Sequence, residues 1–319
     1  MRVTSGDALI ELLRARTVVL TTHINPDGDA LGSMIALYLF LQSRSIQVQM
    51  WLDDNLPRMY SFLPEIEKIV RPPASTLQVD LFVVLDAGDA SRTGISATSY
   101  RGRSLNIDHH LSNRDFADLT VVDETVAATG VIILRMLEEA DCGISKQIAN
   151  CLYTAIATDC GFFRYANTDT QTFYAAARLV SYGAEPNWIS EQLQVMPLSK
   201  ITALSKVLDT LEVSGCGRVA LIEVPPEVNS SDVEDTEGFI DYPRNIFGVE
   251  VAIMFKPSKE KQTVKVSFRS KRLNVSDFAR SLGGGGHARA AGCTLKGTLP
   301  EVKSMVLIRV LSALREAGL

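Results

Sequence analysis

Residues 17–30 read TVVLTTHINPDGDA, and this stretch combines the local signals from which the rest of the fold can be inferred. Thr17–Thr22 is a short run rich in β-branched residues and predicts a strand. The segment HINPDGD that follows carries one histidine and two aspartates, and apolar residues at helical spacing continue from Ala30 to about Ser43. Ligands of open α/β sheets bind at the carboxyl ends of strands, so this polar segment stands where a functional site is expected.

The same alternation of strand and helix signals continues through the first half of the chain. It predicts a parallel α/β sheet, because strands separated by helical segments pair in parallel. The expected strands are Ile46–Leu52, Asp80–Leu85 and Ser104–Ile107, and the expected helices are Val126–Ala140, Ser145–Thr158 and Asp169–Tyr182.

A helical connector with Pro197 near its middle is expected over Trp188–Leu211, and the alternation then restarts. We therefore expect an α/β protein with an N-terminal parallel-sheet domain at 1–189, a helical linker at 190–212 and a smaller C-terminal α/β domain at 213–319. The elements expected in the second domain are strands at Gly217–Val224, Val249–Phe255 and Val264–Phe268 and helices at Val275–Leu282 and Pro300–Glu316.

The composition is that of an ordinary globular protein, with 46% hydrophobic and 22% charged residues in 319. The net charge of −5 disfavours a protein that binds long nucleic acid without sequence preference, because such proteins carry a basic face. Small anionic substrates stay open if metal ions or local arginines supply positive charge.

Neither a secretion signal nor a membrane span is expected. The first 20 residues place Asp7, Glu11, Arg14 and Arg16 among their apolar residues. The five cysteines form no C-x-x-C pair and are odd in number, which favours free thiols in a reducing compartment. We expect a cytoplasmic protein.

Aspartate and histidine side chains recur at the ends of the expected elements. Asp86 follows the strand at 80–85, Asp108-His109-His110 follows the strand at 104–107, and Asp159 follows the helix at 145–158. Clustered carboxylates repel one another unless cations neutralise them. Mixed carboxylate and imidazole ligands suit Mn²⁺, Fe²⁺, Co²⁺ or Zn²⁺ better than Ca²⁺. One aspartate shared by two ions would give the two-metal arrangement used for in-line attack on phosphorus.

Each motif alone also has a structural interpretation. HINPDGD is a common type of turn, Asp86 could cap the following helix, and a His-His pair is often structural or exposed. Three of the four histidines, however, lie beside aspartates in loops that follow strands. Their combination favours a metal site.

These segments resemble a known family. HINPDGDALGS, VVLDAGDASRTG, NIDHH and TAIATDCGFFR are similar, in order and approximate spacing, to the four metal-binding motifs of the DHH phosphoesterase superfamily. GGGGHARAAG resembles the substrate-binding motif of the associated DHHA1 domain. Within the superfamily, the two-domain length matches the nanoRNase/pAp phosphatase group, whose members degrade very short RNAs and dephosphorylate 3′-phosphoadenosine 5′-phosphate (pAp).

The resemblance implies a role for each residue of these motifs. It implies two Mn²⁺ ions, with Mg²⁺, Co²⁺ or Fe²⁺ as alternatives, and Asp86 as the bridging ligand. It implies that His110 faces the substrate phosphate and that Asp108 orients the imidazoles, so that Asp86, His110 and Asp108 form the catalytic set. The implied ligands are His23, Asp27 and Asp86 for one ion and Asp29, Asp86, His109 and Asp159 for the other.

Phosphate contacts are expected from a second group of residues. Gly283–Gly286 followed by His287 could be a flexible linker, but glycines also let backbone N–H groups approach a phosphate. With the resemblance, Arg269 and Ser270 look like phosphate or terminal-nucleotide contacts, while ordinary salt bridges stay open for the two arginines near the metal motifs. The expected substrate-binding residues are Arg269, Ser270, Gly284, Gly285, Gly286, His287, Arg92 and Arg164, with Arg244, Asn245, Lys271 and Arg272 as further candidates.

The function expected from these observations is hydrolysis of short oligoribonucleotides, of pAp, or of both, by two-metal in-line attack of water in a cleft between the domains. One alternative is a phosphodiesterase for linear or cyclic dinucleotides (pApA, pGpG, c-di-AMP). An alternative of another class is a nucleotide-binding regulator without turnover. The resemblance also suggests a homodimer, whereas a membrane partner and a track for long nucleic acid are not expected.

Overall fold

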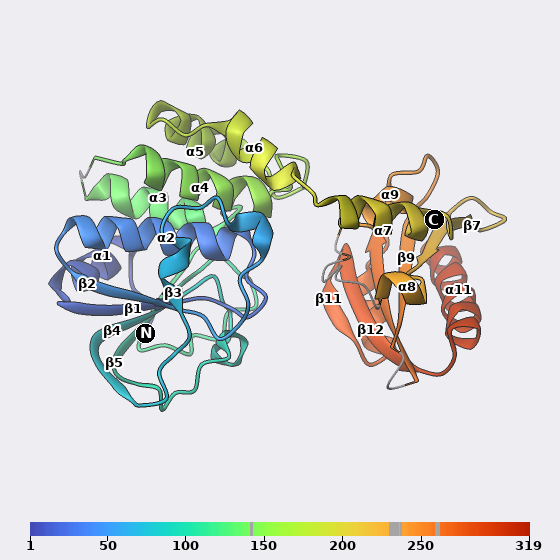
Figure 1. Ribbon diagram of the computed structural model, residues 1–319, viewed down its shortest axis with the longest axis horizontal. Helices are drawn as coiled ribbons and strands as arrows, with labels where there is room; N and C mark the ends of the chain where they lie inside the picture. Colours follow the sequence, from blue (N-terminus) through green and yellow to red (C-terminus); the bar gives the residue numbers. More distant parts are fainter. Residues whose placement is uncertain (141–142, 230–235, 237, 259–261) are drawn as a thin grey trace. The chain divides into compact units, whose positions relative to one another are not determined.

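The computed structural model divides into two compact units, Met1–Val195 and Met196–Leu319 (Figure 1). It describes residues 1–140, 143–229, 236, 238–258 and 262–319. The first unit holds a fully parallel sheet and the second a mixed sheet, so the chain is α/β in both halves, as predicted.

The sheet of the first unit has six strands in the order β3-β2-β1-β4-β5-β6. All neighbouring strands run in parallel. Its central strands carry long apolar runs, as expected for strands that are covered on both faces. The strands are β1 (Thr17–Thr21), β2 (Gln47–Trp51), β3 (Ile69–Val70), β4 (Leu77–Leu85), β5 (Tyr100–Asp108) and β6 (Leu119–Val122).

Helices and loops cover the two faces of this sheet with separate apolar clusters. The larger cluster packs side chains of the sheet against the helices, and Figure 1 shows these helices stacked on one side of it. The smaller cluster lies on the other face and includes Trp51 and Phe82, whose ring stacks on that of Tyr100 with 3.8 Å between centroids. The helices are α1 (Ser5–Arg14), α2 (Gly28–Ser43), α3 (Thr129–Glu139), α4 (Lys146–Asp159), α5 (Thr170–Ser181) and α6 (Pro186–Gln194).

The strand order reverses between β1 and β4. The chain passes from β1 outward through β2 to β3 and then returns to β4 on the other side of β1. Thr21 pairs with Val84, so both strands end at the same edge of the sheet, directly before the segments that hold His23 and Asp86. Ligands of doubly wound sheets bind at such a switch point.

The second unit is built on a sheet in the order β11-β12-β10-β9-β8-β7, antiparallel except for β8 and β9. Its strands are β7 (Glu212–Val213), β8 (Val219–Glu223), β9 (Val251–Ser258), β10 (Thr263–Ser270), β11 (Gly285–His287) and β12 (Ala290–Lys296). Its helices are α7 (Leu198–Leu208), α8 (Pro226–Asn229), α9 (Asp241–Arg244), α10 (Val275–Ser281) and α11 (Leu299–Glu316).

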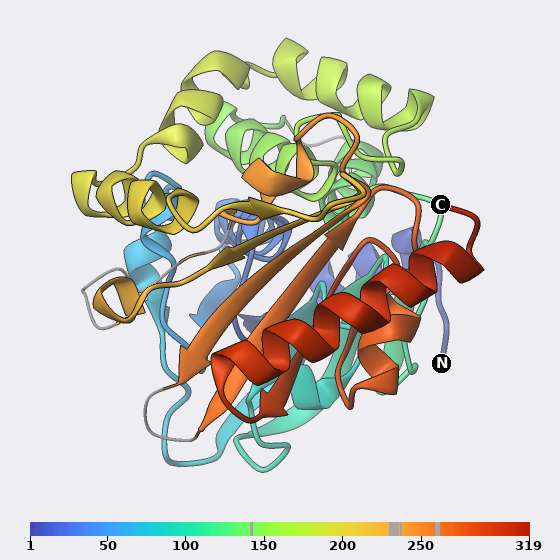
Figure 2. The same cartoon turned by 90° about the vertical axis from the view of Figure 1, so that its right-hand side faces the viewer.

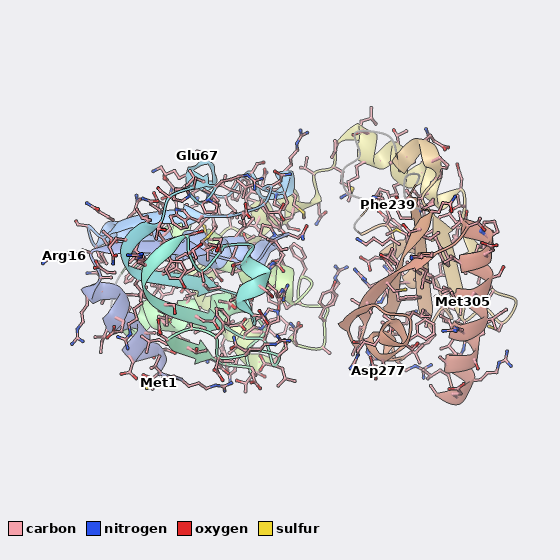
Figure 3. All side chains as sticks on the ribbon, turned by 90° about the horizontal axis from the view of Figure 1, so that it is seen from below. Met1, Arg16, Glu67, Phe239, Asp277 and Met305 are labelled. Carbon is pink, nitrogen blue, oxygen red and sulfur yellow. The ribbon has the colours of Figure 1, made fainter. Side chains whose placement is uncertain are left out.

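Each face of this second sheet has its own core. The long helix α11 lies across the strands on one face (Figure 2), where Val302, Val306 and Val310 are buried. Side chains of α7 and of the segment around α9 form the core on the other face. Phe239 and Met305, labelled in Figure 3, belong to these two different sides.

The predicted helices and strands are present, but the prediction missed several short elements, among them β3, β6, β7, β12, α8 and α9. The expected connector at Trp188–Leu211 is two helices, α6 and α7, interrupted at Val195–Pro197. Helix α1 was not predicted, although Thr4 and Asp7 form a capping box at its start. Gly285–His287 is a strand paired with β12 rather than a loop.

Four cysteines lie in the described residues and all are free thiols: Cys151, Cys160, Cys216 and Cys293. Cys142 lies outside the described residues. Among the described helices, none has the length and apolar composition that crossing a membrane requires.

Candidate metal centre and phosphate-binding residues

All six predicted metal ligands come together at the carboxyl edge of the first sheet, and His110 lies with them. In each of three groups, the ligand atoms lie within 4.8 Å of one another. Two of the groups share Asp86, and two share His109. The groups are His23, Asp27 and Asp86; Asp86, His109 and His110; and Asp29, His109 and Asp159.

His23 is positioned by the segment that joins β1 to α2. Nδ1 lies 2.9 Å from the carbonyl oxygen of Ile24, which fixes the tautomer in which Nδ1 carries the hydrogen. Nε2 is then an acceptor, and it lies 3.6 Å from Oδ2 of Asp86 and 3.8 Å from Oδ2 of Asp27. Only 5% of His23 is exposed. The imidazole is therefore held with its lone pair toward two carboxylates.

Asp27 both caps a helix and faces a predicted metal ligand. It is the N-cap of α2, and Oδ1 accepts a hydrogen bond from the backbone N–H of Ala30 at 3.0 Å. The other oxygen, Oδ2, is the one that faces His23. One carboxylate therefore both begins a helix and faces the ligand cluster.

Asp29 is completely buried in the first turn of α2. Its oxygens accept hydrogen bonds from the backbone N–H groups of Thr129 (2.6 Å) and Gly130 (2.9 Å) at the start of α3, and from the hydroxyl of Ser33 (2.9 Å). The N-terminus of α3 therefore fixes this carboxylate, and its N–H groups partly oppose the rise in pKa that burial causes.

Asp86 directly follows β4 with a φ of 56°, in the left-handed region that non-glycine residues rarely adopt. Oδ1 accepts a hydrogen bond from the hydroxyl of Thr129 at 3.0 Å and lies 3.6 Å from Nε2 of His109. Oδ2 faces His23. The two oxygens of one buried carboxylate are thus presented to two different histidines.

His109 faces three carboxylates. Nδ1 lies 3.3 Å from the carbonyl oxygen of Val126, which leaves Nε2 directed at Asp29 (3.8 Å), Asp86 (3.6 Å) and Asp159 (3.8 Å). Asp159 is the last residue of α4, and its Oδ2 also accepts a hydrogen bond from Nδ2 of Asn167 at 3.4 Å.

His110 is held by Asp108. Nδ1 of His110 donates to Oδ1 of Asp108 at 2.7 Å, and the other oxygen of Asp108 accepts from Nδ2 of Asn113 at 2.6 Å. Asn113 also donates to Asn106, whose amide donates to the carbonyls of Val84 and Ala87. This chain ties the His110 ring to the end of β4.

The pKa values in the cluster reflect crowded, buried carboxylates. Burial, reinforced by the charges of Asp29 and Asp27, raises the pKa of Asp86 well above its ordinary value. Burial and the charge of Asp29 raise the pKa of Asp159 to about 7. Burial disfavours the imidazolium of His109, but the three facing carboxylates outweigh it and raise the pKa to about 9. The ligand set therefore lacks positive charge, and divalent cations would supply it.

The pKa of Asp108, which is not one of the predicted metal ligands, shifts in the opposite direction. Burial disfavours the charged form of Asp108, but the hydrogen bonds from His110 and Asn113 outweigh it and lower the pKa. Asp108 is therefore a stable anion, which suits a group that orients an imidazole.

The separations between imidazole nitrogens and carboxylate oxygens also fit metal ions. They are 3.6–3.8 Å, too long for hydrogen bonds. Two ligands of one ion, each about 2.0–2.2 Å from it, stand roughly 3–3.5 Å apart. The donor set thus matches divalent transition-metal ions in chemistry, and its separations are a few tenths of an ångström longer than those of ligands around a bound ion.

The two arginines near the metal motifs are exposed. The backbone carbonyl of Arg92 accepts from the N–H of Ile24, which ties its segment to the loop that carries His23. Nε of Arg164 donates to the carbonyl of Gly161 at 2.7 Å. The described residues show no ion pair for either guanidinium, and the phosphate contacts expected for both stay predictions.

In the second unit, Arg269 and Ser270 end β10 but face opposite sides of the sheet. Arg269 is half-buried and donates to the carbonyl of Phe268 at 3.1 Å. Ser270 is buried, and its hydroxyl donates to the carbonyl of Leu273 at 2.6 Å. The Ser270 hydroxyl therefore has a partner within the fold, and the substrate contact expected from the sequence stays a prediction.

The glycine run approaches β12 closely. A Cβ on Gly284 would lie 2.1 Å from the carbonyl oxygen of Gly292, and one on Gly286 would lie 2.5 Å from that of Ala290. A Cβ on Gly285 would meet no atom within 4 Å. Two of these glycines are therefore explained by packing, and the third stands on an open side of the edge strand. The side chain of His287 lies outside the described residues.

Comparison with known proteins agrees with this geometry. Residues 17–156 match the model of the DHH family, N-terminal domain, and residues 226–315 match that of the DHHA1 domain. The chain is 34% identical to the bifunctional oligoribonuclease and PAP phosphatase NrnA of Thermus thermophilus, over 94% of this chain and 91% of the relative. The chain belongs to the DHH/DHHA1 phosphoesterase family.

Two further proteins extend the comparison. The bifunctional oligoribonuclease and PAP phosphatase NrnA of Bacillus subtilis is 24% identical over 88% of this chain and 89% of the relative. The crystal structure of an exopolyphosphatase-related protein from Bacteroides fragilis superposes with a TM-score of 0.88 at 25% identity, covering 98% of this chain and 97% of that one. The similarity therefore spans both units.

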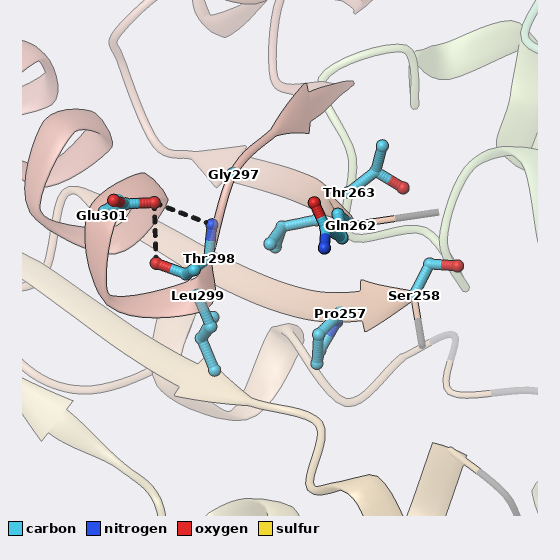
Figure 4. Close-up of a pocket in the computed structure, with 9 residues that line it drawn as sticks. Pro257, Ser258, Gln262, Thr263, Gly297, Thr298, Leu299 and Glu301 are labelled. Atoms are coloured by element: carbon cyan, nitrogen blue, oxygen red, sulfur yellow. Dashed lines mark hydrogen bonds between the residues drawn. The ribbon is translucent and has the colours of Figure 1, made fainter. Parts of the chain in front are cut away.

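Several residues that support the DHH ligands were not predicted from the sequence. Thr129 contacts Asp86 and Asp29, and Asn113 holds Asp108. The DHHA1 unit also has a cavity of about 340 Å³ where β10 begins and α11 starts (Figure 4). Glu301 in its wall accepts two hydrogen bonds from Thr298 as a helix cap. The cavity lies at the end of β10 opposite to Arg269, so it is not part of the predicted phosphate site.

Proposed function

We propose that this protein is a metal-dependent hydrolase that degrades short oligoribonucleotides and removes a phosphate from pAp. The observation that carries the proposal is the set of carboxylates and imidazoles around Asp86, which has the composition and spacing of a site for two divalent cations. The relatives named oligoribonuclease and PAP phosphatase give the substrate class. Mn²⁺ is the proposed ion, since mixed nitrogen and oxygen ligands suit it.

The proposed ligand assignment divides the cluster at Asp86. His23, Asp27 and Asp86 hold one ion, and Asp29, Asp86, His109 and Asp159 hold the other. In support, one oxygen of Asp86 faces His23 and the other faces His109. The tautomers of both histidines leave Nε2 free to bind a cation.

When bound, two such ions lower the pKa of a water molecule and neutralise charge on the phosphoryl oxygens. The residues of the chain position the reacting groups. Asp108 accepts a hydrogen bond from Nδ1 of His110 and fixes the ring, so that Nε2, when it also carries a hydrogen, can donate to an oxygen of the substrate phosphate. Thr129 and the N-terminus of α3 hold Asp86 and Asp29 in place, which limits their reorganisation during the reaction.

Substrate phosphates are proposed to meet the arginines and the glycine strand. Arg269, Gly285 and His287 serve this role from the DHHA1 unit, and Arg92 and Arg164 from the DHH unit. Guanidinium groups suit bidentate contacts to phosphate. We accordingly propose 1–189 as the catalytic domain, 190–212 as the linker and 213–319 as the substrate-binding domain.

The test is phosphate release and product analysis with Mn²⁺ on a panel of substrates: pAp, RNAs of two to five nucleotides, a long RNA, cyclic dinucleotides and pyrophosphate. We expect hydrolysis of pAp and the short RNAs, and loss of at least a thousandfold in the D86A variant. D209A, at an exposed aspartate of the second unit, is the matched control and should keep full activity. Hydrolysis by D86A at the wild-type rate would overturn the proposal.

A further inference from the structure

One large aromatic side chain of the DHHA1 unit is completely exposed. Phe247 lies between α9 and β9 and is 101% exposed. Single exposed apolar residues are common on protein surfaces, so exposure alone carries no function. The turn that carries this ring and the basic side chains near it point to a binding role.

The ring is carried by a tight turn. The N–H of Val249 donates to the carbonyl of Ile246 at 3.2 Å, so residues 246–249 form a β-turn with Phe247 as its second residue. Gly248, the third residue, has a φ of 82°, as a type II turn requires. The turn presents the ring to solvent on an ordered backbone, which reduces the entropy lost when a flat ligand stacks on it.

The turn stands beside the predicted phosphate contacts. Nζ of Lys271 lies 3.4 Å from the carbonyl oxygen of Ile246, and Nε of Arg244 donates to the carbonyl of Ser270 at 3.4 Å. Arg269 precedes Ser270 and pairs with Ala252, whose side chain belongs to the core on the face that α9 covers. The side chain of Lys271, which directly follows β10, therefore reaches from the end of this strand to the turn at residues 246–249.

Five basic residues lie on the described segments around the turn, together with two acidic ones, Asp241 at the start of α9 and Glu250. Glu250 is acidic, but it is buried and accepts hydrogen bonds from the backbone N–H of Arg272 and Leu273 and from Nε of Arg272. Arg289 donates to the carbonyl of Arg272. The basic residues are Arg244, Arg269, Lys271, Arg272 and Arg289.

An exposed aromatic ring on an ordered turn, with cations on one side, is the arrangement by which proteins bind single-stranded nucleic acid. We propose that Phe247 is a stacking platform for a second nucleobase of a short RNA, one nucleotide away from the phosphate held near Arg269. This rests on the proposed function and makes it more specific. Base stacking of this kind is worth about tenfold in affinity per base.

The test compares substrates with one and with several bases. In F247A, the KM for a trinucleotide should rise about tenfold with little change in kcat, while both constants for pAp stay at wild-type values. F247W should restore the KM, because indole also stacks on bases. I308A, which removes an exposed side chain of α11 on the other face of the unit, is the control and should match wild type.

Binding without turnover gives a second readout. The fluorescence of F247W, compared with the wild-type background of two tryptophans, should change with a trinucleotide and not with pAp. This fluorescence signal does not depend on hydrolysis. If the wild-type protein cleaved neither substrate, the proposed function would be wrong, but stacking on residue 247 could still be measured. Two results would overturn the inference: an unchanged trinucleotide KM in F247A, or an equal rise in the KM for pAp.

Discussion

The hydroxyl of Thr129 donates a hydrogen bond to Oδ1 of Asp86 across 3.0 Å, although the two residues are 43 positions apart in the chain. The backbone N–H of Thr129 also donates to Asp29. One residue at the start of α3 therefore positions two carboxylates from different segments, one in the first turn of α2 and one directly after β4. Such contacts to metal ligands orient them and strengthen metal binding.

Replacing Thr129 with valine tests this role, because valine keeps the size and the backbone N–H while removing the hydroxyl. We expect T129V to bind Mn²⁺ about 10- to 100-fold more weakly, with activity recovering at high Mn²⁺. Titration calorimetry and activity against Mn²⁺ concentration measure this. T154V is the matched control, because the hydroxyl of Thr154 is equally buried but donates to the helix carbonyl of Asn150 rather than to a metal ligand. Equal Mn²⁺ affinity in T129V and wild type would contradict the role.

Asp108 is expected to act through His110. D108N removes the charge that stabilises the Nδ1–H tautomer, and we expect kcat to fall about 10- to 100-fold with a smaller change in KM and in bound metal. Steady-state kinetics with metal analysis separates these effects. A variant that loses its metal but keeps kcat when Mn²⁺ is restored would show instead that Asp108 supports the ions. D209N controls for the loss of one carboxylate.

The glycines at 284 and 285 should respond differently to alanine. A Cβ at 284 collides with the backbone of β12, so we expect G284A to destabilise the DHHA1 unit by about 1–3 kcal/mol. G285A has free space and should change stability by less than about 1 kcal/mol. Hydrogen exchange of the β12 amides reports on this unit directly, since both tryptophans lie in the first unit. Equal protection in the two variants would refute the packing argument.

Glu250 gives a pH-dependent contribution to stability. Burial opposes its ionisation, but hydrogen bonds from the backbone of Arg272 and Leu273 and from the Arg272 side chain outweigh it, and the pKa lies below the ordinary value. A lowered pKa in the folded state means that the stabilisation is complete above the ordinary value of about 4.3 and is lost as pH falls through the lowered one. At pH 7 we expect E250Q to be less stable by about 1–3 kcal/mol.

The measurement is the difference in the free energy of unfolding between wild type and E250Q from pH 7 down to pH 3. This difference should shrink below pH 4. E191Q, at an exposed glutamate of α6, controls for the loss of one negative charge. A difference that stays constant or grows toward acid would contradict the lowered pKa.

The sequence was most informative where a functional group is next to a strand end. His23, Asp86 and the pair at 109–110 follow β1, β4 and β5, and parallel strands bring their carboxyl ends to one edge. The strand patterns therefore predicted that these residues meet. The family resemblance added which aspartate would be shared, which the residues alone left open.

Contacts made in three dimensions could not be read from local patterns. Thr129 is an ordinary residue in an apolar segment, and only the packing of α3 against α2 places it at Asp86. Gly285–His287 lacks the side-chain alternation of a strand, and its pairing with β12 leaves no room for a Cβ at Gly286. Helix α1 had a readable signal in Thr4 and Asp7 that the prediction did not use.

The central claim is that Asp86 is shared by two ions. Crystals grown with Mn²⁺ and measured at the manganese absorption edge test it most directly, because anomalous difference maps locate the metal independently of the protein. We predict two peaks on either side of the Asp86 carboxylate, one near His23 and one near His109, and neither in D86A. A single peak, or two peaks away from Asp86, would contradict the account.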